Sequence, residues 1–75
     1  MPVPTREQMR TALVAAFDIV ERSADIYELA MYHPTVEANR TFALAVLETM
    51  ERDGLAERVG RSPVHSRNYM WRLIK

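Results

Sequence analysis

Basic side chains gather in the last third of the chain, where they could bind an anion. Five basic residues and no acidic residue lie between Arg58 and Lys75. Residues 1–50 hold four basic and seven acidic residues, whereas residues 51–75 hold six basic and three acidic ones, so the formal net charge of zero conceals a strong asymmetry. A local positive field attracts a polyanion whatever the total charge. Nucleic acid is therefore a candidate partner, and a solvated basic tail is the alternative.

Catalytic and metal-binding chemistry is not indicated. The chain has no cysteine, and its two histidines, His33 and His65, stand 32 positions apart without a zinc-binding pattern of the H-E-x-x-H kind. No paired acid and base is suggested by the glutamates Glu28, Glu37, Glu48 and Glu51, and no glycine-rich phosphate loop is present. We expect no enzyme activity, no metal and no cofactor.

The length of 75 residues predicts one domain over residues 1–75. The longest apolar stretch, Ala12 to Phe17, is far too short to span a bilayer. The polar start of the chain, punctuated by prolines, does not resemble a signal peptide. We expect a cytoplasmic protein with no membrane contact.

Helical spacing of apolar residues dominates the first two thirds of the chain. Thr5 is a favourable N-cap for a helix over residues 5–22. Ser23 is a favourable N-cap for a second helix, which must end near Tyr32 because His33 precedes Pro34. A third helix starts at Thr35 or at Asn39, and the sequence does not choose between these caps. It ends at Asp53, because the following glycine, Gly54, fits a left-handed helix stop.

After Gly54 the apolar period changes from 3.6 towards 2. Residues 55–59 alternate, residues 60–67 have the composition of a loop, and Tyr69, Trp71 and Leu73 alternate with Met70, Arg72 and Ile74. The pattern predicts a β-hairpin in which Trp71 anchors the core. The expected fold class is α+β, mainly α, with three helices followed by a C-terminal hairpin.

The segment from Leu47 to Leu55 resembles the end of a recognition helix, its glycine stop and the first wing strand of winged helix-turn-helix domains such as those of the MarR and PadR regulators. The run from Asp25 to Ala30 is similar to their positioning helix. The segment from Tyr69 to Leu73 is similar to the second strand of their wing. The resemblance covers about residues 5–75 and implies a DNA-binding regulator of transcription.

Within this resemblance the third helix would read the major groove and the hairpin loop would follow the phosphate backbone. Asn and Arg side chains pair with adenine and guanine edges, and a threonine hydroxyl can bind a phosphate. The implied DNA-binding residues are Thr35, Asn39, Arg40 and Thr41 of the helix, Arg61, His65 and Arg67 of the loop, and Arg58 beside it, with Arg72 as a possible extension. A capping residue, solvated polar side chains and a mobile loop are the alternatives.

Two other functions remain open at this stage. The acidic first half favours a winged helix that binds a protein partner without nucleic acid, and the small size is compatible with an inhibitor of a host protein. Ala12, Ala15 and Ile19 widen the apolar stripe of the first helix beyond what one small core needs, which predicts a homodimer through that helix.

Overall fold

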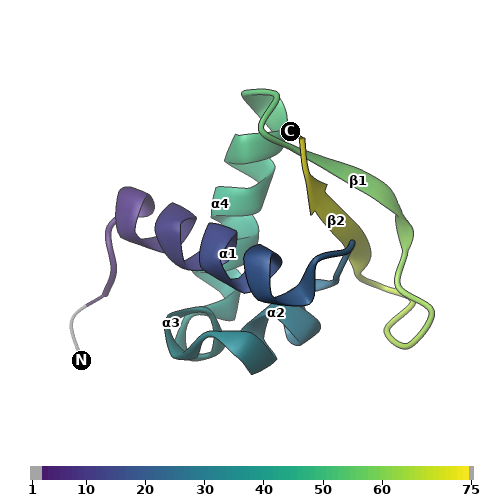
Figure 1. Ribbon diagram of the computed structural model, residues 1–75, viewed down its shortest axis with the longest axis horizontal. Coiled ribbons are helices and arrows are strands. Elements are labelled where there is room, and N and C mark those ends of the chain that lie inside the picture. The colour runs from purple at the N-terminus through teal and green to yellow at the C-terminus, as the bar shows by residue number, and fades with distance from the viewer. Residues whose placement is uncertain (1–2, 75) are drawn as a thin grey trace.

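Four helices and a two-stranded antiparallel hairpin make up the computed structural model, which describes residues 3–74. The elements are α1 (Arg6–Val20), α2 (Ile26–Tyr32), α3 (Pro34–Ala38), α4 (Arg40–Arg52), β1 (Ala56–Arg61) and β2 (Tyr69–Leu73). Helix α1 crosses α4, α2 and α3 lie together at one end, and the hairpin stands at the side (Figure 1). The predicted class, α+β and mainly helical, is confirmed at this level.

The helix caps follow local chemistry, with one correction. Thr5 caps α1 as predicted: its hydroxyl accepts from the Gln8 amide (3.1 Å), and the Gln8 side chain accepts from the Thr5 amide (2.9 Å). The predicted cap of the second helix, Ser23, is wrong, because Asp25 takes this role and accepts from the Glu28 amide at 2.8 Å.

The single helix predicted between residue 35 and Asp53 is two helices, so the expected number of three is wrong. Pro34 opens α3, where its missing N–H is not needed, and the His33 ring nitrogen accepts from the Thr35 amide at 3.2 Å. Asn39 then breaks the helical path (φ −140°, ψ 45°), and its side chain donates to the Thr35 carbonyl at 3.0 Å. Asn39 is thus the N-cap position of α4, one of the two predicted starts.

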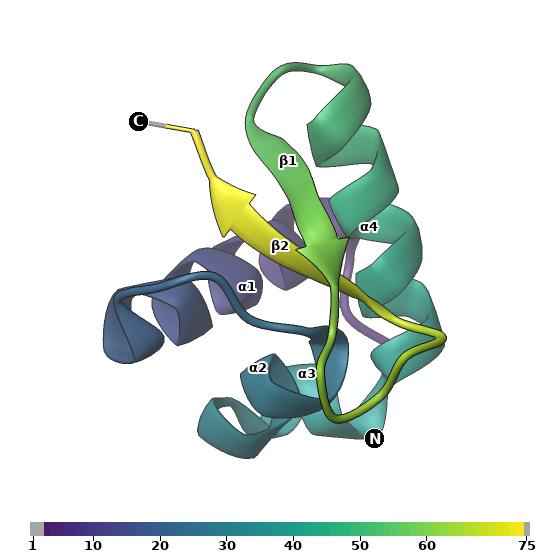
Figure 2. The same ribbon diagram turned by 90° about the vertical axis from the view of Figure 1, so that its right-hand side faces the viewer.

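The hairpin is confirmed and contains a bulge. Register runs from Ala56 opposite Leu73 to Arg58 opposite Trp71, and then shifts so that Arg61 lies opposite Tyr69. The extra residue of β1 falls in the segment that contains Gly60, whose φ of 128° is available only to glycine without strain. Figure 2 shows the two strands side by side, and in both ribbon views the loop extends toward the end that carries α2 and α3.

One residue between α1 and α2 adds to the sheet. Ala24 forms an isolated bridge with Trp71, in which the Ala24 amide donates to the Trp71 carbonyl (2.9 Å) and the Trp71 amide to the Ala24 carbonyl (2.8 Å). The sequence did not predict this bridge, because a single paired residue has no periodicity. It fixes β2 against the chain segment that leads into α2.

The core lies between the four helices and the hairpin. Trp71 is buried as predicted, together with Met9, Leu13, Leu29, Leu47 and Val36. Strand β1 packs on α4, and β2 packs on α1 and α2. Because the hairpin is held by three helices and by Ala24, its loop is carried by a fixed base.

Candidate nucleic-acid interface

Tyr27 of α2 brings two of the predicted DNA-binding residues together. The Arg40 guanidinium carbon lies 4.7 Å from the centroid of the Tyr27 ring, and the His65 ring centroid lies 4.6 Å from it. Arg40 is the first residue of α4 and His65 belongs to the hairpin loop. The start of the long helix and the loop therefore form one surface, joined by an aromatic ring from a third element.

A buried polar network holds the loop in this place. The Ser62 hydroxyl donates to Asp25 Oδ2 at 2.7 Å, and the amides of Val64 (3.3 Å) and His65 (3.1 Å) donate to the Ser62 hydroxyl. Asp25 and Ser62 are only 5% and 3% exposed. Since the other Asp25 oxygen caps α2, one carboxylate connects the helix that carries Tyr27 with the loop that carries His65.

A second group of cations lies on the hairpin beside α4. The guanidinium carbons of Arg58 and Arg61 lie 4.6 and 4.7 Å from the Tyr69 ring centroid, and Arg58 is also 4.9 Å from the Trp71 ring. Residues three positions apart normally face opposite sides of a strand, but the bulge shifts the alternation and lets both arginines contact one ring. Arg58 Nε also contacts Glu51 of α4 at 3.1 Å.

The predicted cations differ in how far acidic neighbours compensate them. Arg58 pairs with Glu51, and Arg40 lies 3.9 Å from Glu37 in an exposed pair that contributes little. Within residues 3–74, neither Arg61 nor Arg67 has a carboxylate within ion-pair distance, and Arg61 instead donates to the Ser66 carbonyl at 3.3 Å. Arg72 pairs with Glu57. Lys75, counted in the basic segment, lies outside the described residues.

The three polar residues predicted beside Arg40 have different positions. Thr35 and Asn39 hold α3 together and line a shallow groove between α3 and the start of α1, whose wall includes Pro4, Gln8 and Thr11. Thr41 is exposed on α4, next to Arg40. The structure therefore groups Arg40 and Thr41 at the helix start, and it places Thr35 and Asn39 in a groove formed with α1.

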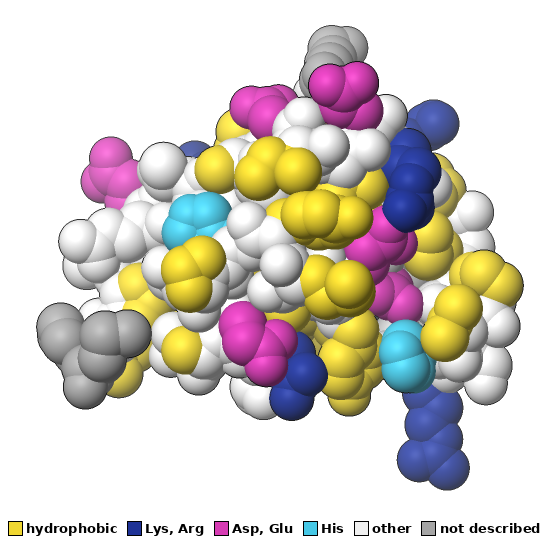
Figure 3. Space-filling view, turned by 60° about the horizontal axis from the view of Figure 1, so that its bottom comes forward, with side chains coloured by type: hydrophobic (Ala, Val, Ile, Leu, Met, Phe, Trp, Pro, Cys, Tyr) yellow, Lys and Arg dark blue, Asp and Glu magenta, His cyan; other side chains and the backbone are white. Residues whose placement is uncertain are grey.

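The end that carries α2 and α3 also exposes apolar side chains. Met31 and Tyr32 of α2 and Val64 of the loop are among the exposed large hydrophobic residues. Figure 3 shows hydrophobic side chains across the middle of this face and charged side chains mainly around them. The face combines an apolar centre with charged side chains of both signs around it.

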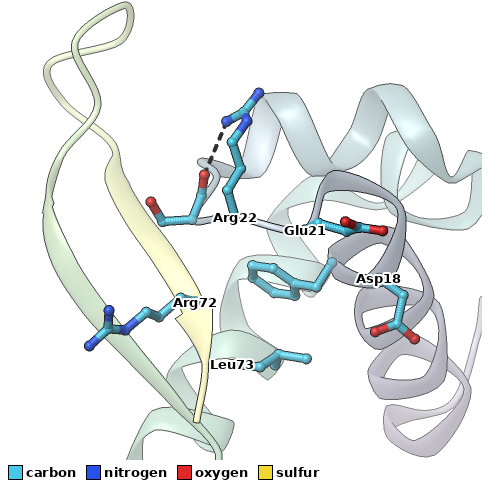
Figure 4. A pocket seen from close by; sticks show the side chains of 7 residues that line it. Asp18, Glu21, Arg22, Arg72 and Leu73 are labelled. Atoms are coloured by element: carbon cyan, nitrogen blue, oxygen red, sulfur yellow. Dashed lines mark hydrogen bonds between the residues drawn. The ribbon is translucent and has the colours of Figure 1, made fainter. Parts of the chain in front are cut away.

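A shallow pocket lies on another part of the surface, between the end of α1 and β2 (Figure 4). Its charged lining residues are Asp18, Glu21, Arg22 and Arg72. The hydrogen bond from Arg22 to Glu28 (3.0 Å) raises the pKa of Arg22. The mixed charges of this pocket give it no net attraction for an anion.

The apolar stripe of α1 is smaller than predicted. Ala12 belongs to the core, Ala15 is half-buried, and only Ile19 is substantially exposed, at 57%. The expected surplus of apolar surface therefore reduces to Ile19 and its partly buried neighbours.

Sequence reasoning missed three residues of this region, Tyr27, Asp25 and Ser62. The N-capping chemistry of Asp25 was available as a signal, since an aspartate precedes the apolar run of α2. The roles of Tyr27 and Ser62 have no signal in the sequence, because both depend on the path of a distant loop.

Comparisons with protein-family models, with curated proteins and with solved structures gave no match for this chain. Among residues 3–74, no cluster of three histidine, aspartate or glutamate side chains is placed to hold a metal ion. No helix in that range combines the length and apolar character needed to cross a bilayer.

Proposed function

We propose that this chain is a winged helix-turn-helix domain that binds duplex DNA and regulates transcription in the cytoplasm. The order of helices and hairpin supports the fold, with Ala24 as the residual first strand and β1–β2 as the wing. The observation that carries the function is the meeting of Arg40 and His65 over Tyr27. A helix start and a wing loop that form one surface can contact a single stretch of DNA.

The contacts in this proposal divide into two kinds. Arg61 and Arg67 of the hairpin, free of acidic partners among the described residues, bind phosphates, and His65 and Arg58 extend this contact. Arg40 and Thr41 at the start of α4 reach base edges or the adjacent phosphates. The backbone of Thr35 supports the helix start, because its amide donates to the His33 ring nitrogen and its carbonyl accepts from the Asn39 side chain.

The test is a fluorescence-anisotropy titration of a labelled duplex of random sequence at two salt concentrations. We expect binding that weakens as salt rises, because each phosphate contact releases counterions. The double variant Arg61→Ala/Arg67→Ala should bind more weakly and with a smaller salt dependence. Arg10→Ala is the matched control, since Arg10 is an exposed arginine on α1. A folded wild-type protein that binds no duplex at either salt concentration would refute the proposal.

A protein-binding winged helix is the second candidate. The exposed Met31, Tyr32 and Val64 favour it, because an apolar centre surrounded by charge is typical of protein interfaces. Substitution of Met31 by a charged residue separates the two functions: it disrupts an apolar protein contact and leaves a phosphate contact intact.

A homodimer through α1 completes the DNA-binding proposal. Ile19 is its exposed apolar contact, and a two-fold pair would place two α4 helices about one DNA turn apart, roughly 34 Å. Such a dimer would read a site with two half-sites.

A further inference from the structure

We infer that Tyr27 is the positioning residue of the DNA-binding surface, which makes the helix contact and the loop contact act as one unit. The inference rests on the proposed function and adds a residue to it. Tyr27 is not a contact predicted by the sequence, and it lies on α2, outside both α4 and the loop. Among residues 3–74, its ring is nevertheless the only one that makes a ring–ring or cation–π interaction with both elements.

The geometry explains how one ring orders two distant side chains. Arg40 and His65 are 25 positions apart, and each lies within 5 Å of the Tyr27 ring centroid. An aromatic face attracts a guanidinium and also stacks with an imidazole ring, so both side chains lose conformational freedom before any ligand arrives. A binding surface that is already ordered loses less conformational entropy on association and therefore binds more tightly.

The nearest competitor for Arg40 does not remove this effect. Glu37 Oε2 lies 3.9 Å from Arg40 Nη1, and both side chains are about half exposed, so water screens the pair. The phosphate backbone can therefore replace Glu37 as the anionic partner while the guanidinium remains on the Tyr27 ring. The buried Asp25–Ser62 hydrogen bond holds His65 independently of Arg40.

The chain offers a closely matched control. Tyr32 lies on the same helix and is 43% exposed, compared with 40% for Tyr27, but no ring or guanidinium in the described part of the chain stacks on it. Tyr32→Ala therefore removes the same side chain from a similar environment without touching Arg40 or His65. Tyr27→Phe keeps the ring and removes only the hydroxyl.

The experiment measures duplex affinity for the full chain and its variants, with circular dichroism as the check of folding. Without the Tyr27 ring, the Arg40 and His65 side chains must both be ordered on binding, so Tyr27→Ala should weaken duplex affinity about 5- to 30-fold. Tyr27→Phe and Tyr32→Ala should stay within about twofold of wild type. In the Tyr27→Ala background, Arg40→Ala and His65→Ala should each have a smaller effect than in wild type, because the ordering that Tyr27 gives these side chains is already lost.

The possible results distinguish failure of the proposed DNA-binding function from failure of the positioning role of Tyr27. If wild type binds no DNA, the proposed function and the role of Tyr27 both fail. If wild type binds DNA and Tyr27→Ala binds as tightly as wild type or Tyr32→Ala, the proposed function stands and the positioning role is overturned. The positioning role is also overturned if Tyr27→Phe binds as weakly as Tyr27→Ala. Additive effects of Tyr27→Ala and Arg40→Ala would also overturn it. The His65 ring-proton shifts in the free protein should move on Tyr27→Ala and not on Tyr32→Ala.

Discussion

Removal of the Ser62 hydroxyl is the most direct test of how the hairpin loop is held. Ser62→Ala deletes the hydroxyl that donates to Asp25 Oδ2 at 2.7 Å. The buried carboxylate oxygen then lacks this hydrogen bond. It also removes the acceptor of the Val64 and His65 amides. A hydrogen bond to a charged group contributes about 1.5–3 kcal/mol, so we expect a loss of about 2 kcal/mol in the free energy of unfolding.

This loss is large for so small a domain. A chain of this length has a total stability of about 4–11 kcal/mol, so the variant should fold with a clearly reduced margin. For domains of this size, 1 kcal/mol corresponds to about 4–8 °C, and the expected decrease in Tm is therefore about 8–16 °C. Thermal and urea unfolding followed by circular dichroism measure it.

The matched control is Ser66→Ala in the same loop. Ser66 is exposed, and its backbone carbonyl accepts the Arg61 contact, so its side chain can be truncated without loss of that contact. We expect a change within about 0.5 kcal/mol, as for ordinary surface positions. The reasoning is refuted if Ser62→Ala unfolds at the same temperature as Ser66→Ala, because the Asp25–Ser62 bond would then contribute nothing to the loop.

The other predictions concern the bulge, two arginines of the hairpin, the helix start and the dimer. Gly60→Ala should destabilise the hairpin by about 1–2 kcal/mol, because a φ of 128° strains any residue with a Cβ. The added Cβ itself meets no atom within 4 Å, so the cost lies in the backbone alone. An unchanged urea midpoint would contradict this prediction. Arg61→Ala and Arg67→Ala should each lower the salt slope of duplex binding by about 0.9 with little change in preference among sequences. Arg40→Ala should instead reduce the preference for the best site over random DNA, by about 1–3 kcal/mol, and a uniform loss on all duplexes would exclude base contact. Sedimentation should show a dimer at high micromolar concentration that Ile19→Glu dissociates, whereas a wild-type monomer of 8.7 kDa would reject the α1 interface.

Features that depend on neighbouring residues could be predicted from the sequence. The Thr5 cap, the end of α2 before Pro34 and the left-handed stop at Gly54 each arise from the chemistry of a few adjacent positions. The change of period after Gly54 likewise predicted the hairpin and the burial of Trp71, because alternation along a strand is a local property. The errors at this level were choices between near neighbours: Asp25 rather than Ser23 as a cap, and a break at Asn39 within one expected helix.

The candidate site depends on contacts that no local pattern encodes. Ser62 meets Asp25 across 37 positions of sequence, and this contact helps to place His65 on Tyr27 and so beside Arg40. The sequence alone determined which residues carry positive charge and, apart from the break at Asn39, which segments form helices and strands. The tertiary structure decided which of those residues lie together on one surface. The path of the loop depends on a buried hydrogen bond that forms only when the helices and the hairpin have packed.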